Sequence, residues 1–296
     1  MSHTLDVSIV IVNWNVKDIL HRCLESLYQY THGITFEIFV IDNASSDGSV
    51  DMIRKNFPYV QLIANTENAG FGKAQNQGIQ QARGKYICIF NPDTAITDNV
   101  FKKMFDWMEH PEHTKVVLLG PKLMYPDGRP QPSIKRFPTA VSQMIILLKC
   151  HHVFGWFGPV RRYLAKDFDY NIEQPVDQMM GACIFARASA LHALKGFDED
   201  FWIWFEDVDL CKRSKASGWE NWYTPLISII HHEGKSFGQI FSPTKQRYFN
   251  ASLKVYARKY YNAPSQIILA FLAPVSLFLS YIVSWLHIKP RPQSRV

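Results

Sequence analysis

The sequence lacks the cysteine and charge patterns that mark several common classes of protein. Its five cysteines include no Cys-x-x-Cys pair and lie mostly among apolar neighbours, which predicts reduced, buried thiols in a cytosolic compartment. Cys150, His151 and His152 are adjacent, but a fourth metal ligand at a suitable spacing is missing. The formal net charge is +6 without any block of Lys and Arg, so duplex nucleic acid is not an expected partner. This charge is compatible with phosphate-rich ligands or an anionic membrane surface.

The N-terminal region lacks both a secretory signal and a glycine-rich phosphate loop. An apolar, β-branched strand is expected from Val7, so no signal peptide is expected before it. The turn after this strand, at residues 13–17, contains no glycine. A dinucleotide-binding oxidoreductase, in which Asp42 would hold a ribose, needs glycine there so that pyrophosphate can approach the backbone. That class is therefore disfavoured, and so is a nucleotidyltransferase with a glycine-rich, basic triphosphate loop.

Charged residues are absent from residues 267–286 near the C-terminus. This run is just long enough to cross a hydrocarbon core of about 30 Å. Pro274 interrupts it, and Ser276, Ser280 and Ser284 recur at every fourth position. Basic residues flank both sides, so the positive-inside rule assigns no orientation. We expect a membrane-associated helix that either spans the bilayer or lies in it as a monotopic or re-entrant segment; a buried C-terminal helix is the alternative.

Apolar, β-branched runs alternate with segments of helical periodicity over the first hundred residues. Strands are expected at residues 7–13, 36–41, 60–64 and 86–90, with helices between them. This order predicts an α/β fold in which a doubly wound, mostly parallel sheet carries helices on both faces. Further strands are expected at residues 116–119, 181–186, 219–223 and 226–230.

Asp93 follows the most continuous apolar strand of the chain. Residues 86–90 are apolar throughout and Pro92 ends the strand, so Asp93 stands just past its carboxyl end. In open α/β sheets such positions face the ligand crevice, which makes Asp93 a candidate for binding a ligand or a metal. The alternative is an ordinary turn or helix-capping aspartate.

Two aromatic residues and two acids stand together in the second half of the chain. Trp202 and Trp204 precede Glu206 and Asp207, which fall in the first turn of an expected helix. The exposed N–H groups and the dipole there favour the anionic form, and an ionised carboxylate beside an aromatic platform suits a general base for a sugar hydroxyl. Helix capping with core aromatics is the alternative. His231, at the end of another expected strand, is a metal-ligand candidate.

In combination these segments resemble the family 2 glycosyltransferases, in particular the bacterial branch that includes rhamnosyltransferases for cell-surface polysaccharide. The resemblance covers residues 7 to about 260. It is carried by IVNWN at residues 11–15, DNASSDGS at 42–49, NTENAGFGKAQN at 65–76, NPD at 91–93, GACI at 181–184, GFDE at 196–199, FEDVDLC at 205–211 and HHEGKS at 231–236.

The resemblance implies a GT-A fold that binds a nucleotide-diphosphate sugar with Mg²⁺ or Mn²⁺ and inverts the anomeric carbon. Residues 1–100 would form the nucleotide-sugar-binding half of the domain, residues 101–263 the acceptor-binding and catalytic half, and residues 264–296 the hydrophobic segment and basic tail. Asp42 would contact the nucleobase. The implied donor site comprises Val12, Asn13, Asn15, Asp42, Asn68, Gly70, Asn76 and Asn91.

The resemblance also assigns the metal and catalytic roles. Asp93 aligns with the metal-binding acid of the family's Asp-x-Asp motif, whose first position is Asn91 here, and His231 resembles the second metal ligand. Asp207 aligns with the catalytic base and Glu206 would support it. The acceptor-binding residues would be Trp202, Trp204 and Gly181. Arg247, on the following helix, is either a contact to the diphosphate through its planar guanidinium or a solvated helix charge.

These assignments predict a metal-dependent inverting transferase at the cytoplasmic face of the bacterial inner membrane. Loss of a nucleoside diphosphate builds negative charge, which a divalent cation held by few protein oxygens neutralises. The expected acceptor is a lipid-linked saccharide, and the branch resemblance suggests dTDP-L-rhamnose as donor. The alternative is a catalytically silent sugar-nucleotide-binding partner in polysaccharide assembly.

Overall fold

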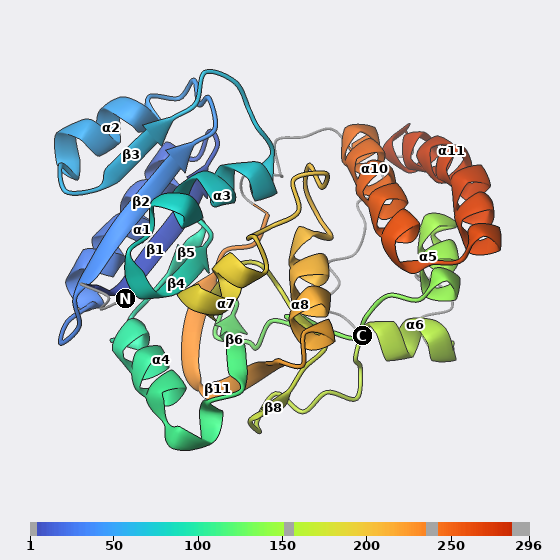
Figure 1. Cartoon of the computed structure of the whole chain (residues 1–296). Coiled ribbons are helices and arrows are strands. Elements are labelled where there is room, and N and C mark those ends of the chain that lie inside the picture. Colours follow the sequence, from blue (N-terminus) through green and yellow to red (C-terminus); the bar gives the residue numbers. More distant parts are fainter. Residues whose placement is uncertain (1–4, 151–156, 235–241, 286–296) are drawn as a thin grey trace.

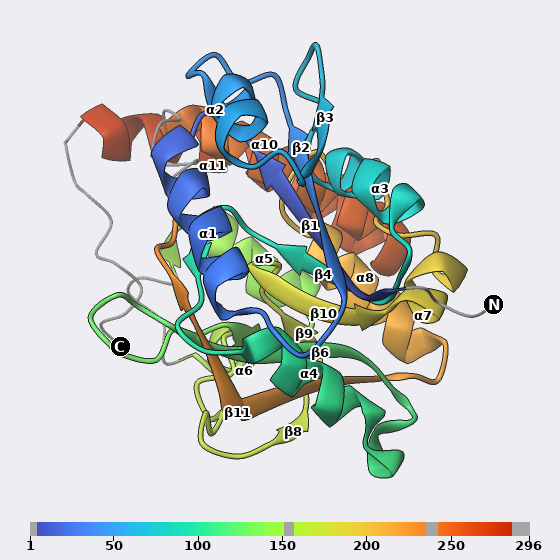
Figure 2. The same ribbon diagram turned by 90° about the vertical axis from the view of Figure 1, so that its left-hand side faces the viewer.

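A single large sheet organises the fold, and the computed structural model describes residues 5–150, 157–234 and 242–285 (Figures 1 and 2). β1 (Leu5–Asn13) lies between β2 (Phe36–Asp42) and β4 (Gly84–Phe90), and β3 (Gln61–Ala64) pairs with the far side of β2. All of these pairings are parallel. Their apolar runs are continuous because both faces of a parallel sheet are covered by helices.

The second half of the chain completes the sheet in the order β3-β2-β1-β4-β10-β6-β11-β5, with β8 also paired to β11. β10 is antiparallel to both of its neighbours, whereas β11 is parallel to β6. The predicted doubly wound, mostly parallel sheet is therefore confirmed. The strands added here, with a separate β7–β9 pair, are β5 (Thr94–Ala95), β6 (Val116–Met124), β7 (Ile134–Lys135), β8 (Gln174–Pro175), β9 (Gln178–Met179), β10 (Cys183–Arg187) and β11 (Glu220–His231).

Two expected strands, at residues 219–223 and 226–230, form the single strand β11. Its pairing with β6 shifts register between Thr224 and Ser228. Pro225, which lies inside this shift, has no N–H to donate to the ladder. The proline therefore produces an irregularity inside one strand, not a break between two.

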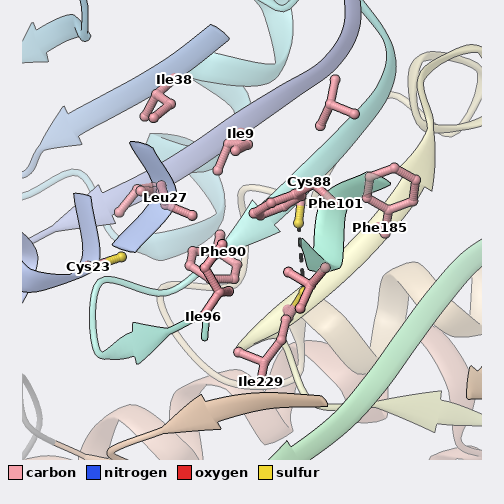
Figure 3. Packing of buried hydrophobic residues seen from close by; sticks show 14 of the residues in the cluster. Ile9, Cys23, Leu27, Ile38, Cys88, Phe90, Ile96, Phe101, Phe185 and Ile229 are labelled. Atoms are coloured by element: carbon pink, nitrogen blue, oxygen red, sulfur yellow. Dashed lines mark hydrogen bonds between the residues drawn. The ribbon is translucent and has the colours of Figure 1, made fainter. Parts of the chain in front are cut away.

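Helices cover both faces of the sheet with separate apolar clusters. One cluster packs α1 (Lys17–Tyr30), α2 (Ser49–Asn56) and α4 (Val100–Glu109) on the sheet, and Figure 3 shows Leu27, Phe101, Ile9 and Phe90 within it. The other cluster packs the opposite face, using α3 (Phe71–Gln81), α7 (Ala188–Ala193) and α8 (Glu206–Ala216). A short 3-10 turn, η1 (Pro111–His113), follows α4.

The cysteines agree with the prediction of reduced thiols. All five are free, and four of them are buried while Cys150 is partly exposed. Cys88 and Cys183 lie with their sulfur atoms 3.7 Å apart in the first cluster (Figure 3).

A helical layer stands on the side of the molecule away from α2 and β3 (Figure 1). It contains α5 (Ala140–Leu147), α6 (Gly158–Tyr163), α10 (Ser242–Tyr260) and α11 (Ala263–Trp285). A third apolar cluster joins α5, α10 and α11 to the segment just before α8. Among the described residues, α11 is the one helix long and apolar enough to cross a membrane. The predicted basic tail beyond residue 285 and positions 235–236 of the last motif lie outside the described residues.

Strand direction places the polar strand ends at one edge. β1, β2, β3, β4, β6 and β11 run the same way, because β10 is antiparallel to both β4 and β6. Asn13, Asp42, Asn91 and His231 therefore share the carboxyl edge of the sheet. The strand order reverses between β1 and β4, which is where open α/β sheets bind ligands.

Candidate active site

A buried polar ring closes the ends of β1 and β2. Asn13 Nδ2 donates to Asp42 Oδ1 at 2.7 Å and to Ser45 Oγ at 3.1 Å, and the Ser45 N–H donates to Asp42 Oδ2 at 2.8 Å. The Asn15 N–H adds a bond to Ser45 Oγ at 2.9 Å. Asn13 and Asp42 are almost fully buried. In this structure Asp42 orders the turn, and its contact with a nucleobase stays a prediction.

The loop between β3 and α3 is held by a residue that the sequence reasoning did not single out. Asn43 Oδ1 accepts from Asn65 Nδ2 and from the Ala69 N–H, both at 3.1 Å. Asn43 Nδ2 donates to Asn68 Oδ1 at 3.0 Å and to the Gly70 carbonyl at 3.1 Å. The amide thus uses both its donors and its acceptor on one loop. Its sequence signals were its place two residues after the predicted strand and its position in the DNASSDGS segment at residues 42–49.

Gly70 brings this loop against Trp202, a residue predicted for acceptor binding. Its φ is +84°, and a Cβ there would lie 2.9 Å from the Trp202 carbonyl oxygen and 3.0 Å from the Trp202 ring. The next residue, Phe71, donates its N–H to the same carbonyl at 2.8 Å. Only glycine fits both the conformation and the space. Trp202, predicted for the acceptor, therefore also contacts the predicted donor loop.

Asn76 has a structural role in the fold. Its Nδ2 donates to the Phe197 carbonyl and to Glu199 Oε1, both at 2.9 Å, and its Oδ1 accepts the Phe197 N–H at 2.9 Å. The side chain ties α3 to the segment that leads toward the predicted base. The donor contact implied for Asn76 would have to compete with these bonds, and it stays untested.

Asp93 and His231 come together where β5 pairs with β11. Thr94 is the register partner of His231, and the His232 N–H donates to the Asp93 carbonyl at 2.8 Å. His231 Nε2 lies 3.3 Å from Asp93 Oδ1, and both side chains are buried. The two predicted metal ligands, far apart in the chain, therefore meet.

Two further side chains orient the imidazole of His231. Gln131 Nε2 donates to Glu233 Oε2 at 2.9 Å, which leaves Gln131 Oε1 facing His231 Nδ1 at 2.8 Å. Because that oxygen can only accept, Nδ1 carries the proton, and in the neutral ring Nε2 then directs a lone pair toward Asp93. Such outer partners orient metal ligands in proteins. Neither Gln131 nor Glu233 was predicted from the sequence.

The Asp93–His231 pair fits a divalent cation held by few protein groups. A carboxylate oxygen and an imidazole lone pair that face each other form a site for a positive charge. The side-chain oxygen of Asn91, two residues earlier, is buried and accepts no hydrogen bond from the described residues. Within those residues, no three His, Cys, Asp or Glu side chains cluster in a way that could hold a metal. A bound cation would therefore take its remaining ligands from a diphosphate or water.

Asp207 begins α8 with its carboxylate held by backbone donors. Oδ2 accepts the Gly181 N–H at 3.0 Å, and Oδ1 accepts the Val208 N–H at 2.7 Å. Glu206 is 6% exposed with Oε2 lacking a partner in the described part of the chain, whereas Asp207 keeps part of its surface accessible. A substrate can reach Asp207 more readily than Glu206.

Burial, not the helix dipole, dominates the protonation of this pair. Burial raises the pKa of Asp207 above its ordinary value, and the N–H groups of Gly181 and Val208 offset this only in part. Burial and the neighbouring Asp207 charge raise the pKa of Glu206 well above its ordinary value. Burial therefore outweighs the stabilisation of the anionic form that was expected at the helix start, because desolvation penalises the charged form. A raised pKa suits a base that must accept a proton near neutral pH.

The backbone before the acids is in an unusual conformation. Trp204 and Phe205 have φ values of +64° and +68°, which bulky residues rarely adopt. Phe205 is buried against α10, and Ser252 Oγ of α10 donates to the Ile203 carbonyl at 2.7 Å. Such strained residues persist where packing holds them, and they concentrate at functional sites.

The predicted base and the predicted metal site lie at the same edge of the sheet. The Asn91 N–H donates to the Ala182 carbonyl at 2.9 Å, and the neighbouring Gly181 N–H binds Asp207. Asp207 is thus connected through residues 181–182 to the strand end that carries Asp93. A pocket of about 120 Å³ lies elsewhere, between residues 134–136, 165–168 and 174–177, and no candidate site residue lines it. Converging side chains, not that pocket, define the site.

Three predicted residues contact the helical layer. Trp202 is 40% exposed and stacks on Tyr248 of α10, and Trp204 contacts Phe249. Arg247 is exposed, and its guanidinium donates to the Tyr281 hydroxyl of α11 at 3.1 Å. The structure thus connects Arg247 to the apolar helix, and its contact with a diphosphate stays a prediction.

Comparison with known proteins places this geometry among glycosyltransferases. The family model described as Glycosyl transferase family 2 matches residues 8–168. N-acetylglucosaminyl-diphospho-decaprenol L-rhamnosyltransferase of Mycobacterium tuberculosis is 27% identical over 245 residues, which are 78% of this chain and 77% of that protein. The succinoglycan biosynthesis protein ExoO of Rhizobium meliloti is 28% identical over 171 residues, covering 54% of this chain and 49% of its own.

Solved structures confirm the predicted GT-A fold. Mannosyltransferase PcManGT from Pyrobaculum calidifontis, in complex with GDP-Man and Mn²⁺, superposes with a TM-score of 0.57 at 15% identity, covering 95% of this chain and 74% of its own. The structure of S. aureus TarS 1-349 gives a TM-score of 0.53 at 15% identity, covering 86% of this chain and 72% of its own.

Proposed function

The chain belongs to glycosyl transferase family 2 and is a glycosyltransferase, and from that premise we propose that it is metal-dependent, inverts the anomeric carbon and uses a lipid-linked acceptor. The observation that carries this proposal is the convergence of Asp93, His231 and Asp207 at one sheet edge, linked by the Asn91–Ala182 and Gly181–Asp207 hydrogen bonds. The metal pair would lie beside the leaving diphosphate, and the base beside the attacking hydroxyl.

Asp207 would perform the proton transfer in this reaction. The acceptor oxygen bonds to the anomeric carbon as the bond from that carbon to the donor phosphate breaks, and the hydroxyl proton passes to the Asp207 carboxylate. The Gly181 and Val208 N–H groups hold that carboxylate in place. A positioned base contributes roughly a hundredfold to ten-thousandfold in rate.

Asp93 and His231 would hold Mg²⁺ or Mn²⁺. The cation, when bound, neutralises the charge that grows on the leaving diphosphate. Gln131 and Glu233 keep His231 Nε2 available for it. The Asn91 side-chain oxygen, which accepts no bond from the described residues, would accept a hydrogen bond from the bound donor or a coordinated water.

The finer proposal is an L-rhamnosyl transfer from dTDP-L-rhamnose to a polyprenyl-diphosphate-linked sugar at the cytoplasmic face of the bacterial inner membrane. The name of the M. tuberculosis relative supports the sugar and the lipid-linked acceptor. The long apolar helix α11 supports a membrane location.

The test is product formation by the full-length protein with a panel of nucleotide sugars, a polyprenyl-diphosphate-linked N-acetylglucosamine acceptor and Mn²⁺ or Mg²⁺. Turnover that a chelator abolishes and added metal restores is expected, with inverted stereochemistry at the product. Undiminished turnover after chelation would overturn the metal dependence. Donor binding by the wild type without any transfer would favour the catalytically silent alternative.

A further inference from the structure

Helix α11 has two faces of opposite character. Phe271, Phe278 and Trp285 are spaced by seven residues and are 74%, 65% and 80% exposed. Side chains seven apart lie on the same face of a helix, and Ile267 and Val275, also exposed, fall on the same side. We call these five residues the apolar strip. The buried residues Leu269, Ser276 and Ser280 lie on the opposite side of the helix. A helix surrounded by lipid on all sides needs no difference between its faces, whereas a helix lying at an interface has one apolar face toward the lipid and another face away from it.

The covered face of α11 lies along α10. Gln266 Nε2 donates to the Tyr261 carbonyl at 2.8 Å, and Asn250 Nδ2 donates to the Ala273 carbonyl at 2.9 Å. Near the other end, Arg247 donates to the Tyr281 hydroxyl at 3.1 Å. Residue numbers rise along one helix as they fall along the other, so the two helices form an antiparallel hairpin over most of their length (Figure 1).

Helix α10 cannot accompany α11 into a hydrocarbon core. Arg247, Lys254 and Arg258 are exposed and recur at spacings of seven and four, so they form a basic stripe on one face of α10. Charged side chains inside a bilayer are costly and normally line a protein interior or a water-filled cavity. The other side of α10 is fixed to the catalytic domain, through Ser252 to Ile203 and through Lys259 to Asp198. Spanning by α11 would therefore require the hairpin to separate.

We propose that α11 lies in the plane of the membrane surface instead of crossing it, with the apolar strip inserted and the basic stripe of α10 contacting anionic lipid headgroups. The Arg247–Tyr281 contact joins the two surfaces, because Tyr281 is itself exposed at the border of the apolar strip. Both ends of α11 then remain on the side of the catalytic domain. Because α10 also contacts residues 203–205, which precede the proposed base, membrane binding through α10 and α11 would hold that segment at a constant height above the bilayer.

This inference deepens the proposed function, since a lipid-linked acceptor presents its hydroxyl at that surface, but its test needs no turnover. Single cysteines replace Ile267, Phe271, Phe278 or Trp285 in full-length protein whose partly exposed Cys150 is serine, and each receives a spin label. Collisional quenching then reports depth in vesicles of phosphatidylcholine and phosphatidylglycerol. Tyr59→Cys, 87% exposed beyond α2, is the matched aqueous control.

If α11 lies in the membrane plane, all four labels should report the same shallow depth, and the label at position 59 should remain in water. A spanning helix predicts the central labels near the bilayer midplane and the outer two at opposite interfaces, because 18 residues of helix extend about 27 Å. The spanning pattern would overturn the proposal, as would labels that stay in water at all four positions.

The basic stripe is tested separately by Lys254→Gln with Arg258→Gln. Binding to anionic vesicles is expected to fall about fivefold for each charge removed, and binding to neutral vesicles to stay the same. Arg54→Gln with Lys55→Gln, an exposed pair on α2, is the matched control and should bind as the wild type does. An equal loss in both pairs, or a loss in neither, would contradict the role of the stripe.

Transfer to a water-soluble acceptor analogue, measured on the same preparations, separates the two hypotheses. Transfer with a spanning depth pattern would overturn the in-plane helix and leave the proposed function intact. A shallow depth pattern without transfer to any acceptor would support the in-plane helix and count against the proposed function.

Discussion

The predicted donor-side and base-side regions of the site differ in how densely their polar groups are hydrogen-bonded. Around Asn13, Asp42 and Asn43, short hydrogen bonds join strand ends and loop into a dense network, in which the Asn13 side-chain oxygen alone accepts no bond from the described residues. Around Asp207 the backbone is strained at Trp204 and Phe205, and a buried Glu206 oxygen has no partner among the described residues. Dense hydrogen-bond networks give rigidity, whereas desolvation raises the pKa of a buried carboxyl group. This difference agrees with the proposed roles, in which the first region binds the donor and the second holds the base.

The largest effect is expected at the base. Asp207→Asn keeps the shape and most hydrogen-bonding atoms but cannot accept the acceptor proton, so kcat should fall roughly a hundredfold to ten-thousandfold. Donor affinity, measured by calorimetry, should remain near that of the wild type. Asp51→Asn, an exposed acid in the first turn of α2, is the matched control for a change of charge at a helix start. Retained turnover in Asp207→Asn would remove this residue from the role of base.

The proposed metal pair, Asp93 and His231, lies at the same edge of the sheet, and the second-largest effect is expected from the side chains that orient it. Gln131→Leu removes the acceptor for His231 Nδ1–H, so the metal concentration for half-maximal activity should rise about tenfold to a hundredfold. Gln143→Leu, another buried glutamine, should leave that concentration unchanged.

A swap sharpens this result. In the double variant Gln131→Glu with Glu233→Gln, the carboxylate at position 131 accepts from both His231 and the new amide, which restores the acceptor for His231 Nδ1–H and reverses the direction of the bond between positions 131 and 233. Metal dependence should return toward the wild type. If Gln131→Leu has no effect on metal dependence, or the swap is worse than the single change, the orienting role is wrong.

The contact between the regions is tested at Gly70. Gly70→Ala places a methyl group 2.9 Å from the Trp202 carbonyl oxygen at a φ of +84°, so we expect a loss of about 1–3 kcal/mol in the free energy of unfolding. Gly128→Ala is the matched control, because Gly128 has the same φ of +84° with nothing within 4 Å. Denaturant titration of both variants isolates the Trp202 contact, and equal losses would mean that it contributes nothing.

The smallest effect is a dependence of stability on pH. The folded-state pKa of Glu206 is raised, so between its ordinary value and that raised value the folded chain binds more protons than the unfolded chain. The free energy of unfolding therefore decreases as pH rises through this window, by at most about 1.4 kcal/mol per pH unit for one proton. Glu206→Gln should flatten this decrease and raise the midpoint of thermal unfolding at neutral pH. A steeper decrease in the variant would contradict the assignment.

Part of this comparison was visible in the sequence. The apolar runs at residues 7–13, 36–41 and 86–90 became β1, β2 and β4 within one or two residues, and the positions just after them carry Asp42, Asn43 and Asp93. In open α/β sheets such positions face the ligand crevice, which was predicted for Asp93, whereas no role was predicted for Asn43. β11 was predicted as two strands because Pro225 interrupts its apolar pattern, and such a pattern does not reveal a register shift within one strand.

The remaining features depend on contacts between distant segments. Gln131 and His231 are 100 positions apart in the sequence, and Asn76 and Phe197 are 121 positions apart. No local sequence pattern therefore predicts either hydrogen bond. The raised pKa values of Glu206 and Asp207 were not predicted, because a helix start is readable from spacing, whereas burial is not.

By itself, the sequence determined the alternation of strands and helices, the polar groups at the strand ends and the apolar length of α11, because these follow from local periodicity and composition. Only the tertiary structure decided which of those groups meet, which are desolvated, and that α11 lies along a charged helix. Distances and burial arise when the chain packs, and they set the free energy of each charge and each hydrogen bond at the site.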